Sequence, residues 1–229
     1  NCLTSELAPA GFCEYQSWGD WTAPSVDLED AFGVSPLDNP KSRAKSDTRR
    51  KATMMMADDE YDYWWTDKGG FKYLKFLYDK TYAPGSNDGL QSGTGANIAK
   101  HLYGDDADHV KTFGISAGKQ SSSLSTHVLR LADVYLIYAE AKIGNNESTT
   151  DASAIDAFYQ VWHRARPTDF EKPSSITLDQ VLKERRLEFA FEGDYWFDLV
   201  RMSYYNVDKA MNIIKNQRRN CYYGLGDLY

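Results

Sequence analysis

The residues best suited to chemistry in this sequence are aromatic side chains set among carboxylates. The main group lies at residues 61–65, with two tryptophans upstream, and acids occupy positions 58–60, 62 and 67. An aromatic face can stack on the C–H face of a sugar ring, while carboxylates and amides accept hydrogen bonds from its hydroxyls. Neighbouring tryptophans point to opposite sides of a strand, so at least one of Trp64 and Trp65 is expected in the core. The predicted ligand-binding residues are Trp18, Trp21, Tyr61, Tyr63, Trp64, Trp65, Tyr82, Asn87 and Asp88.

Metal-binding and catalytic motifs are weak by comparison. Asp105, Asp106 and Asp108 offer closely spaced oxygen ligands of the kind calcium prefers, but no EF-hand glycine or terminal glutamate follows them. Residues 114–118 have the letters of a Gly-x-Ser-x-Gly motif without its strand-then-helix context. Phosphate-binding and dinucleotide-binding glycine motifs are absent. We therefore predict no metal, no cofactor and no enzymatic activity.

Composition excludes several classes of protein. The 229 residues include 32 aromatic ones, which is too many for a disordered chain, and no apolar run is long enough to span a membrane. The net charge of −7 argues against a nucleic-acid binder, and we interpret the basic cluster at 41–51 as neutralising the acids that follow it. Cys2, Cys13 and Cys221 are too few for a disulfide framework, and both a Cys2–Cys13 bridge and free thiols stay open.

The elements that must position these residues change character near residue 127. The first 127 residues hold 12 of the 16 glycines and 5 of the 7 prolines, which predicts a loop-rich part with short strands and the ligand surface. We expect a strand at 49–57, with 62–66 continuing it and 71–78 pairing with it. The aromatics divide evenly at this point, 16 on each side. Those before it are expected within reach of a ligand, and those after it in a scaffold.

Residues 128–229 are predicted to be a helical scaffold. An apolar helix is expected at 128–143, and a second at 152–166 with Asp151 as its N-cap. Thr177 and Gln180 form a capping box for a third helix that runs to about 191, and 196–202 and 207–216 follow as shorter helices. Successive antiparallel helix pairs predict tetratricopeptide-like packing.

Charged residues at three- and four-residue spacing mark the helical part. The segment 184–201 alternates acids and arginines, which favours ion pairs on and between helices over a ligand site. Such pairs would fix how one helix lies on the next. The predicted structural ion pairs involve Arg164, Arg166, Arg185, Glu188, Glu192, Asp198 and Arg201.

Four blocks resemble the SusD/RagB family of outer-membrane proteins. LRLADVYLIYAEA at 129–141 is similar to that family's LRxADxYLxYAEA helix, and ERRLEF at 184–189 with FEG at 191–193 and WFDLVR at 196–201 is similar to its ERRxEF…EGxRWFDLxR segment. PSVDLEDAF at 24–32 and DTRR at 47–50 resemble two further family blocks. The order and separation of the blocks also match, and they correspond to the C-terminal half of a family chain.

The resemblance implies a fold and a function. The implied fold is mainly α, with tetratricopeptide-like helix pairs and an irregular α+β insert. The implied protein is an outer-leaflet lipoprotein of a Bacteroidota outer membrane, anchored by a lipid outside this chain. It would capture oligosaccharides without chemistry and pass them to a SusC-like TonB-dependent transporter. Alternatives are a peptide as cargo, a helical scaffold that binds only protein and, least favoured, a glycoside hydrolase.

Overall fold

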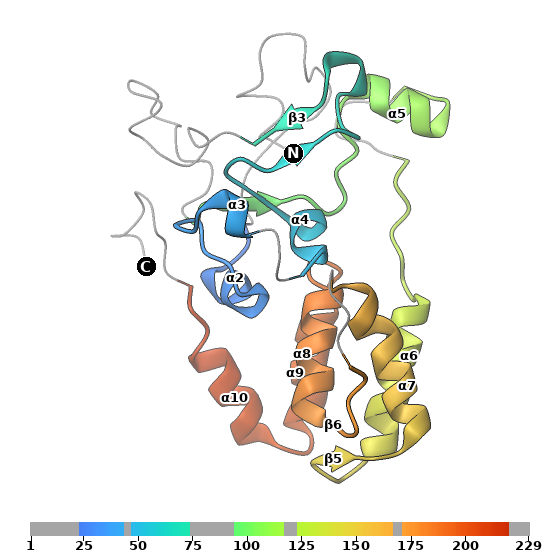
Figure 1. The fold of residues 1–229 in the computed structure, drawn as a ribbon. Helices are drawn as coiled ribbons and strands as arrows, with labels where there is room; N and C mark the ends of the chain where they lie inside the picture. Colours follow the sequence, from blue (N-terminus) through green and yellow to red (C-terminus); the bar gives the residue numbers. More distant parts are fainter. Residues whose placement is uncertain (1–22, 44–46, 74–93, 117–122, 167–170, 220–229) are drawn as a thin grey trace.

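The computed structural model describes residues 23–43, 47–73, 94–116, 123–166 and 171–219. The longest helices occupy one end of the molecule, and short helices, short strands and loops occupy the other (Figure 1). The fold is mainly α with an irregular α+β region, as predicted. Within these ranges, no helix has the length and apolar character that crossing a membrane requires.

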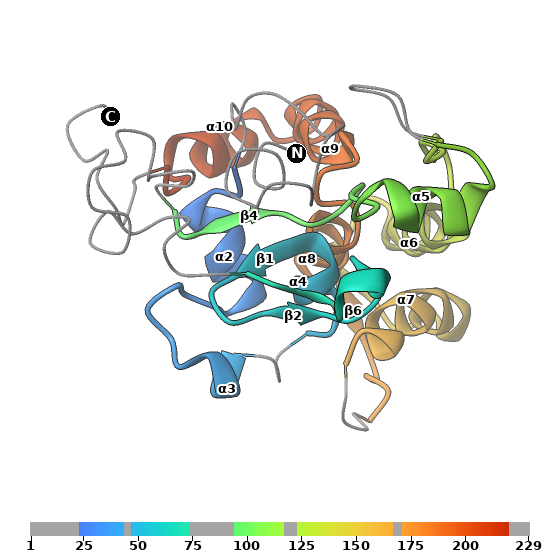
Figure 2. The ribbon, with the colours of Figure 1, turned by 90° about the horizontal axis from the view of Figure 1, so that it is seen from above.

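The helical end is built from α6 (Leu131–Ile143), α7 (Ala152–Arg164), α8 (Leu178–Glu188), α9 (Asp194–Ser203) and α10 (Val207–Lys215). A short antiparallel pair, β5 (Ser148–Thr149) with β6 (Ile176–Thr177), closes the far end of the α6–α7–α8 group. The three helices share one hydrophobic core, and Leu136, Phe158 and Val181 are among its buried residues. Figure 2 shows α6 and α7 side by side.

Helix starts follow the predicted caps. Asp151 accepts hydrogen bonds from the backbone of Ser153 (2.9 Å) and Ala154 (3.0 Å). Thr177 and Gln180 form the predicted capping box, in which the Gln180 N–H donates to Thr177 Oγ1 at 3.1 Å and the Thr177 N–H donates to Gln180 Oε1 at 2.8 Å. These side chains satisfy amide donors that have no partner inside the helix.

One helix end was predicted wrongly. The helix expected to reach about residue 191 ends at Glu188, and Gly193 is the N-cap of the next helix, α9. The Lys100 ammonium donates to the backbone carbonyls of Glu188 (3.0 Å) and Ala190 (3.1 Å). A lysine that satisfies carbonyls at a helix end takes the place of the hydrogen bonds that a longer helix would provide.

The loop-rich end contains short helices and two strand pairs. The helices are α2 (Val26–Phe32), α3 (Pro40–Arg43), α4 (Arg49–Thr53) and α5 (Asp106–Phe113), with a 3-10 turn η1 (Thr66–Lys68). β1 (Met54–Met56) pairs antiparallel with β4 (Ala96–Ile98), and β2 (Glu60–Tyr61) pairs antiparallel with β3 (Phe71–Lys72).

The predicted strand at 49–57 is wrong over its first half. Residues 49–53 form α4, and only 54–56 are strand. Buried Arg50 forms an ion pair with Asp59 and donates to Asp59 Oδ1 at 3.0 Å, which ties α4 to the turn before β2. Residues 62–66 do not continue the strand, and 71–72 pair with β2 instead of β1. Residues 74–78 lie outside the described ranges.

Hydrophobic and charged contacts join the two ends of the molecule. One core cluster combines Met54 and Met56 of β1 with Leu187 of α8 and Ala190. In the view of Figure 1, α4 lies directly above the C-terminal end of α8. Arg49 of α4 pairs with both Glu184 and Glu188, each at 2.8 Å. The first part of the chain therefore packs directly on the helices.

Glu188 is the centre of a charged network between these elements. Its buried carboxylate accepts hydrogen bonds from Arg49, Arg130 and Arg164. Burial alone would raise the pKa of Glu188, but these hydrogen bonds outweigh burial and hold the pKa at about 2. Further ion pairs of the predicted residues include Arg166–Glu184, Arg130–Glu192, Lys100–Glu192, Arg185–Asp198, Arg201–Asp198 and Arg201–Glu140.

Candidate ligand-binding cleft

A cleft of about 770 Å³ lies at the loop-rich end, between the β2–η1 segment and α5. Asp62, Tyr63, Trp64 and Thr66 line one wall. The other lining residues come from α5 and the loops that flank it: Leu102, Tyr103, Asp108, Lys111, Thr112, Phe113 and Leu124. Aromatic walls with a few polar groups are typical of small-molecule sites.

Tyr63 presents the accessible aromatic surface of this cleft. The residue is 56% exposed, whereas Tyr61 and Trp64 beside it are 0% and 7% exposed. Its ring meets Tyr61 edge to face at 5.8 Å between centroids and an interplanar angle of 89°, and it meets Trp64 at 5.4 Å and 68°. Edge-to-face contacts of this kind are favourable and directional. Buried aromatic residues therefore hold an exposed ring at the mouth of the cleft.

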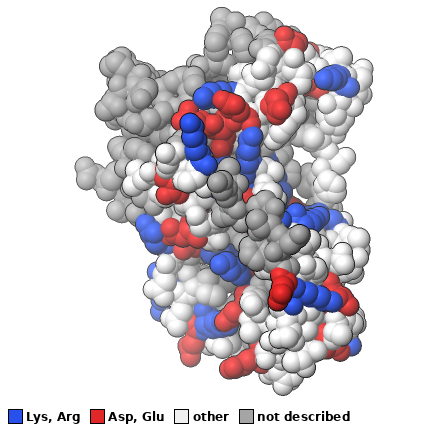
Figure 3. Space-filling model, viewed as in Figure 1, with Lys and Arg blue, Asp and Glu red and all other residues white. Residues whose placement is uncertain are grey.

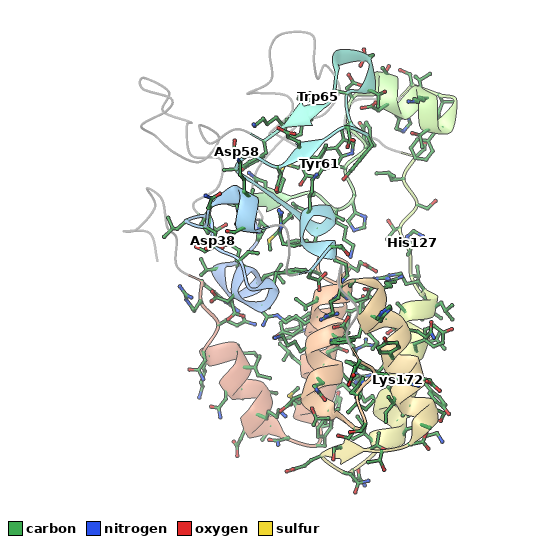
Figure 4. All side chains as sticks on the ribbon, in the orientation of Figure 1. Asp38, Asp58, Tyr61, Trp65, His127 and Lys172 are labelled. Carbon is green, nitrogen blue, oxygen red and sulfur yellow. The ribbon has the colours of Figure 1, made fainter. Side chains whose placement is uncertain are left out.

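Buried aromatic packing supports this wall from behind. Tyr61 stacks on Trp64 at 4.4 Å, and Trp65 packs edge to face against Phe71 at 4.5 Å. The Tyr61 hydroxyl donates to the Lys51 carbonyl at 2.9 Å. Figure 4 shows Tyr61 directed toward α4 and Trp65 near the β3 end of the molecule.

Asp108 holds the two walls together. Its carboxylate accepts hydrogen bonds from the Trp65 N–H, from the Thr66 N–H at 3.1 Å and from the Thr66 hydroxyl at 2.9 Å. Trp65 has left-handed backbone angles, φ 51° and ψ 47°, so the chain turns sharply there and directs both N–H groups toward α5. One buried carboxylate thus fixes the width of the cleft.

Gly104 makes room for that carboxylate. A Cβ atom at this position would lie 2.1 Å from Asp108 Oδ2, and its φ of +84° is one that glycine adopts without strain. Asp105 and Asp108 also form the capping box of α5, in which the Asp108 N–H donates to Asp105 Oδ1 at 3.1 Å. A side chain at position 104 would push α5 away from the opposite wall.

The three calcium candidates have other roles in the described structure. Asp105 and Asp108 cap α5, and Asp106 accepts from the Ser116 hydroxyl at 2.8 Å. Across the described ranges, no group of three or more histidine, cysteine or acidic residues is arranged to hold a metal. The carboxylate of Asp108 already accepts hydrogen bonds from N–H and O–H groups, and these protons occupy the positions that a cation would need.

His109 fixes the far side of α5. The residue is 1% exposed, its Nε2 accepts from the Ser123 N–H at 3.0 Å, and its Nδ1 lies 2.7 Å from the Ile115 carbonyl oxygen. A backbone N–H can only donate, so Nε2 carries no proton and Nδ1 donates to Ile115. The ring packs between Tyr103 (4.9 Å) and Phe113 (4.7 Å), which both line the cleft.

Polar groups in the cleft suit a hydroxyl-rich ligand. Burial, followed by the charges of Asp62 and Asp59, raises the pKa of Tyr63, so its hydroxyl stays protonated at neutral pH and can donate. Asp62 supplies an exposed acceptor, and Lys111 supplies a donor. The hydroxyls of Thr66 and Thr112 donate to Asp108, so they can still accept from a ligand. The cleft therefore offers a ring to stack on together with donors and acceptors.

The structure places the predicted ligand residues unequally. Trp18, Trp21, Tyr82, Asn87 and Asp88 lie outside the described residues. Tyr61, Trp64 and Trp65 are at most 7% exposed and pack into one core cluster, so the expectation of at least one buried tryptophan is confirmed, and in fact both are buried. Trp64 still lines the cleft with part of its surface. Among the predicted ligand residues that the structure describes, Tyr63 is the one with a solvent-exposed side chain.

Sequence reasoning missed the α5 wall. Tyr103, Lys111 and Phe113 were not selected, although they flank the acidic stretch that begins at Asp105. The available signal was the capping box itself, because an Asp at the N-cap and an acid three residues later predict a helix start. A helix there would have placed residues 108, 111 and 112 on one face.

A second hollow of about 930 Å³ lies at the junction of the two ends. It is lined by the Glu188 network, including Arg49, Lys100, Arg130 and Arg164. Each of these four cations is already paired with Glu188 or Glu192. Those charges hold elements together, so the aromatic cleft is the stronger candidate for a ligand.

Comparison with known proteins places the chain in a family. The SusD family model matches residues 17–227. A SusD-like protein of Bacteroides ovatus is 36% identical over 173 residues, which cover 75% of this chain and 27% of that protein. The chain thus spans about a quarter of the length of this curated relative.

Solved structures agree with this assignment. One crystal structure superposes with a TM-score of 0.70 at 30% identity, over 95% of this chain and 37% of the other. A second, determined with xylogluco-oligosaccharide, has a TM-score of 0.69 at 30% identity, over 96% of this chain and 38% of the other. With the family match over most of its length, this chain belongs to the SusD family.

Proposed function

We propose that this chain provides a non-catalytic binding surface for oligosaccharides, and that the sugar stacks on Tyr63 in the cleft between the β2–η1 segment and α5. The observation that carries the proposal is the exposed Tyr63 ring, held edge-on by buried Tyr61 and Trp64 at the mouth of a polar, aromatic-walled cleft. A relative with similar structure was determined with xylogluco-oligosaccharide, which supports a glycan as the ligand class.

Calorimetric titration with xylogluco-oligosaccharide, followed by a panel of other glycans, tests this proposal. Tyr63→Ala should weaken the affinity for the best-bound glycan at least about tenfold, as expected for truncation of a central aromatic contact. Tyr205→Ala is the matched control, because Tyr205 is 55% exposed and lies beyond α9 in the helical part. Equal affinities for the two variants, with both folded, would contradict the assignment of the cleft.

A hydrolase is the competing enzymatic function, and the cleft gives it little support. A glycosidase needs two carboxyl groups that flank the scissile bond, one of which donates a proton. Of the two acids that line the cleft, Asp108 is committed to hydrogen bonds from Trp65 and Thr66. Chromatography of the oligosaccharide after prolonged incubation should show no shortened products, and their appearance would favour the enzyme.

Membership of the SusD family supports a wider role for the whole protein. We infer that it acts as an outer-leaflet lipoprotein of the outer membrane and delivers captured oligosaccharide to a SusC-like TonB-dependent transporter. The full-length protein should co-purify from native membranes with a TonB-dependent transporter. Recovery of the protein without such a partner, under conditions that keep outer-membrane complexes intact, would contradict delivery.

A further inference from the structure

The glycan cleft lies in an acidic part of the molecule. Residues 54–73 and 101–116, which build both walls, contain eight acidic residues and three lysines. Figure 3 shows acidic side chains over the β2–β3 region and around α5, with basic groups between them. Three of the acids are buried and already satisfied: Asp59 pairs with Arg50, and Asp105 and Asp108 cap α5.

Four acids of residues 54–73 are exposed, and one of them lines the cleft. Asp62 lines the cleft and is exposed, and Asp67 follows on η1. Asp58 and Glu60 flank β2 with side chains that are 57% and 71% exposed, and they share one cation, Lys72. Their combined charge therefore stays negative after pairing.

Lys111 is the one cation among the described residues that line the cleft. It lies on α5, one turn after Asp108. Two carboxylates, Asp62 and Asp108, line the same space. A carboxylate or sulfate on the ligand would therefore meet more negative than positive charge, at distances where Coulomb repulsion in water is weak but measurable.

From these charges we infer that the cleft selects neutral oligosaccharides and rejects those that carry uronate or sulfate groups. The inference rests on the proposed function, since it assigns a ligand class to the same cleft. The carboxylates do not repel a neutral sugar, so its affinity is not reduced, and its hydroxyls can donate hydrogen bonds to Asp62. An anionic sugar of the same backbone adds the repulsion without gaining a cation beyond Lys111.

A matched pair of ligands tests the inference: a neutral xylo-oligosaccharide and the same backbone carrying one glucuronate. At low salt the neutral form should bind about fivefold more tightly, which is the scale expected for one or two unscreened charges in water. The ratio should fall toward one when NaCl is raised from about 10 mM to about 500 mM, because screening then acts within a few ångströms.

Two charge variants localise the effect. Asp62→Asn removes one negative charge at the cleft, and it should reduce the preference for the neutral ligand at low salt. Asp208→Asn is the control, because it makes the same change in net charge on exposed α10, at the opposite end of the molecule from α5 (Figure 1). It should leave the preference unchanged.

The outcomes separate the two proposals. If both ligands bind with equal affinity, or the preference does not depend on salt, oligosaccharide binding stands and selection by charge is wrong. If the glucuronate form binds more tightly, the inference is also overturned. If neither these ligands nor any other glycan binds, the proposed function itself fails.

Discussion

Two groups of aromatic side chains, one at each end of the molecule, have opposite settings. In the loop-rich part, Tyr61, Trp64 and Trp65 are at most 7% exposed and pack into a core, although loops and acids surround them in the sequence. In the helical part, Trp196 and Phe197 of α9 are 60% and 70% exposed. These five residues depart from the expectation of accessible aromatics before residue 127 and scaffold aromatics after it, although other aromatic residues of the helical core follow it.

This difference is the reason that we assign the proposed ligand to Tyr63 and not to the most exposed rings. Trp196 and Phe197 are more exposed than Tyr63, yet neither lines the cleft. Tyr63 is distinguished by its support: buried rings fix its plane, and polar groups face it across a cleft. A ring held in place loses little conformational entropy when a ligand stacks on it.

The largest expected effect is on stability, and the same substitution at both ends tests the comparison. Trp64→Ala should lower the free energy of unfolding by about 3–5 kcal/mol, because it leaves a cavity beneath Tyr61 and Phe71. Trp196→Ala should change it by less than about 0.5 kcal/mol, as for other surface positions. Urea denaturation measures both. Similar losses for the two variants would contradict the assignment of burial.

The network that joins the two ends should show the next largest effect. Glu188→Gln removes the charge that Arg49, Arg130 and Arg164 share, and it should cost about 3 kcal/mol, the range for breaking a buried ion pair. Glu147→Gln, at an exposed position, is the control. Denaturation at neutral pH measures both variants, and a cost for Glu188→Gln no larger than that of the control would contradict the role of the network.

Acid should weaken the same network in the wild-type chain. The folded-state pKa of Glu188, about 2, lies below its ordinary value of 4.5, so the unfolded chain binds the proton first as pH falls. This contribution to stability is complete above pH 4.5 and is lost as the pH drops toward 2. Glu188→Gln should therefore show a weaker acid dependence over this window.

Glu29 of α2 should give an effect of opposite sign. It is 0% exposed, and neither carboxylate oxygen has a hydrogen-bond partner among the described residues. Burial, with a further contribution from Asp30, raises its pKa from 4.5 to about 8. The folded chain therefore holds this proton more tightly than the unfolded chain, and stability should fall as pH rises from 4.5 to 8.

Glu29→Gln isolates that contribution. The variant should gain about 4 kcal/mol relative to wild type at pH 8, and the gain should vanish near pH 4.5. Thermal denaturation across this pH range measures the difference. A variant that is equally destabilised at every pH would show that Glu29 is held as a charged, hydrogen-bonded group.

Local sequence signals predicted the helical end well, because its helix starts depend on side chains a few residues apart. Asp151 caps α7, and Thr177 with Gln180 caps α8, as their spacing indicated. The loop-rich end depends on distant contacts. Arg50 is buried by its pairing with Asp59, and Asp108 binds Trp65 across 43 positions of sequence.

The same reason explains why the cleft could be predicted only in part. Strand alternation would have exposed either Trp64 or Trp65, but the left-handed backbone at Trp65 breaks that alternation and buries both. Tyr63 was selected on composition, whereas the α5 wall required knowledge of the Asp108 contacts. Sequence identified the type of residue, and tertiary contacts decided which ring is exposed.

A crystal structure of this chain with a bound neutral oligosaccharide tests the central claim most directly. A sugar ring should stack on the exposed face of Tyr63, with its hydroxyls near Asp62 and the α5 residues Lys111 and Thr112. A sugar bound instead on Trp196 and Phe197 of α9, with the cleft beside Tyr63 empty, would contradict the account.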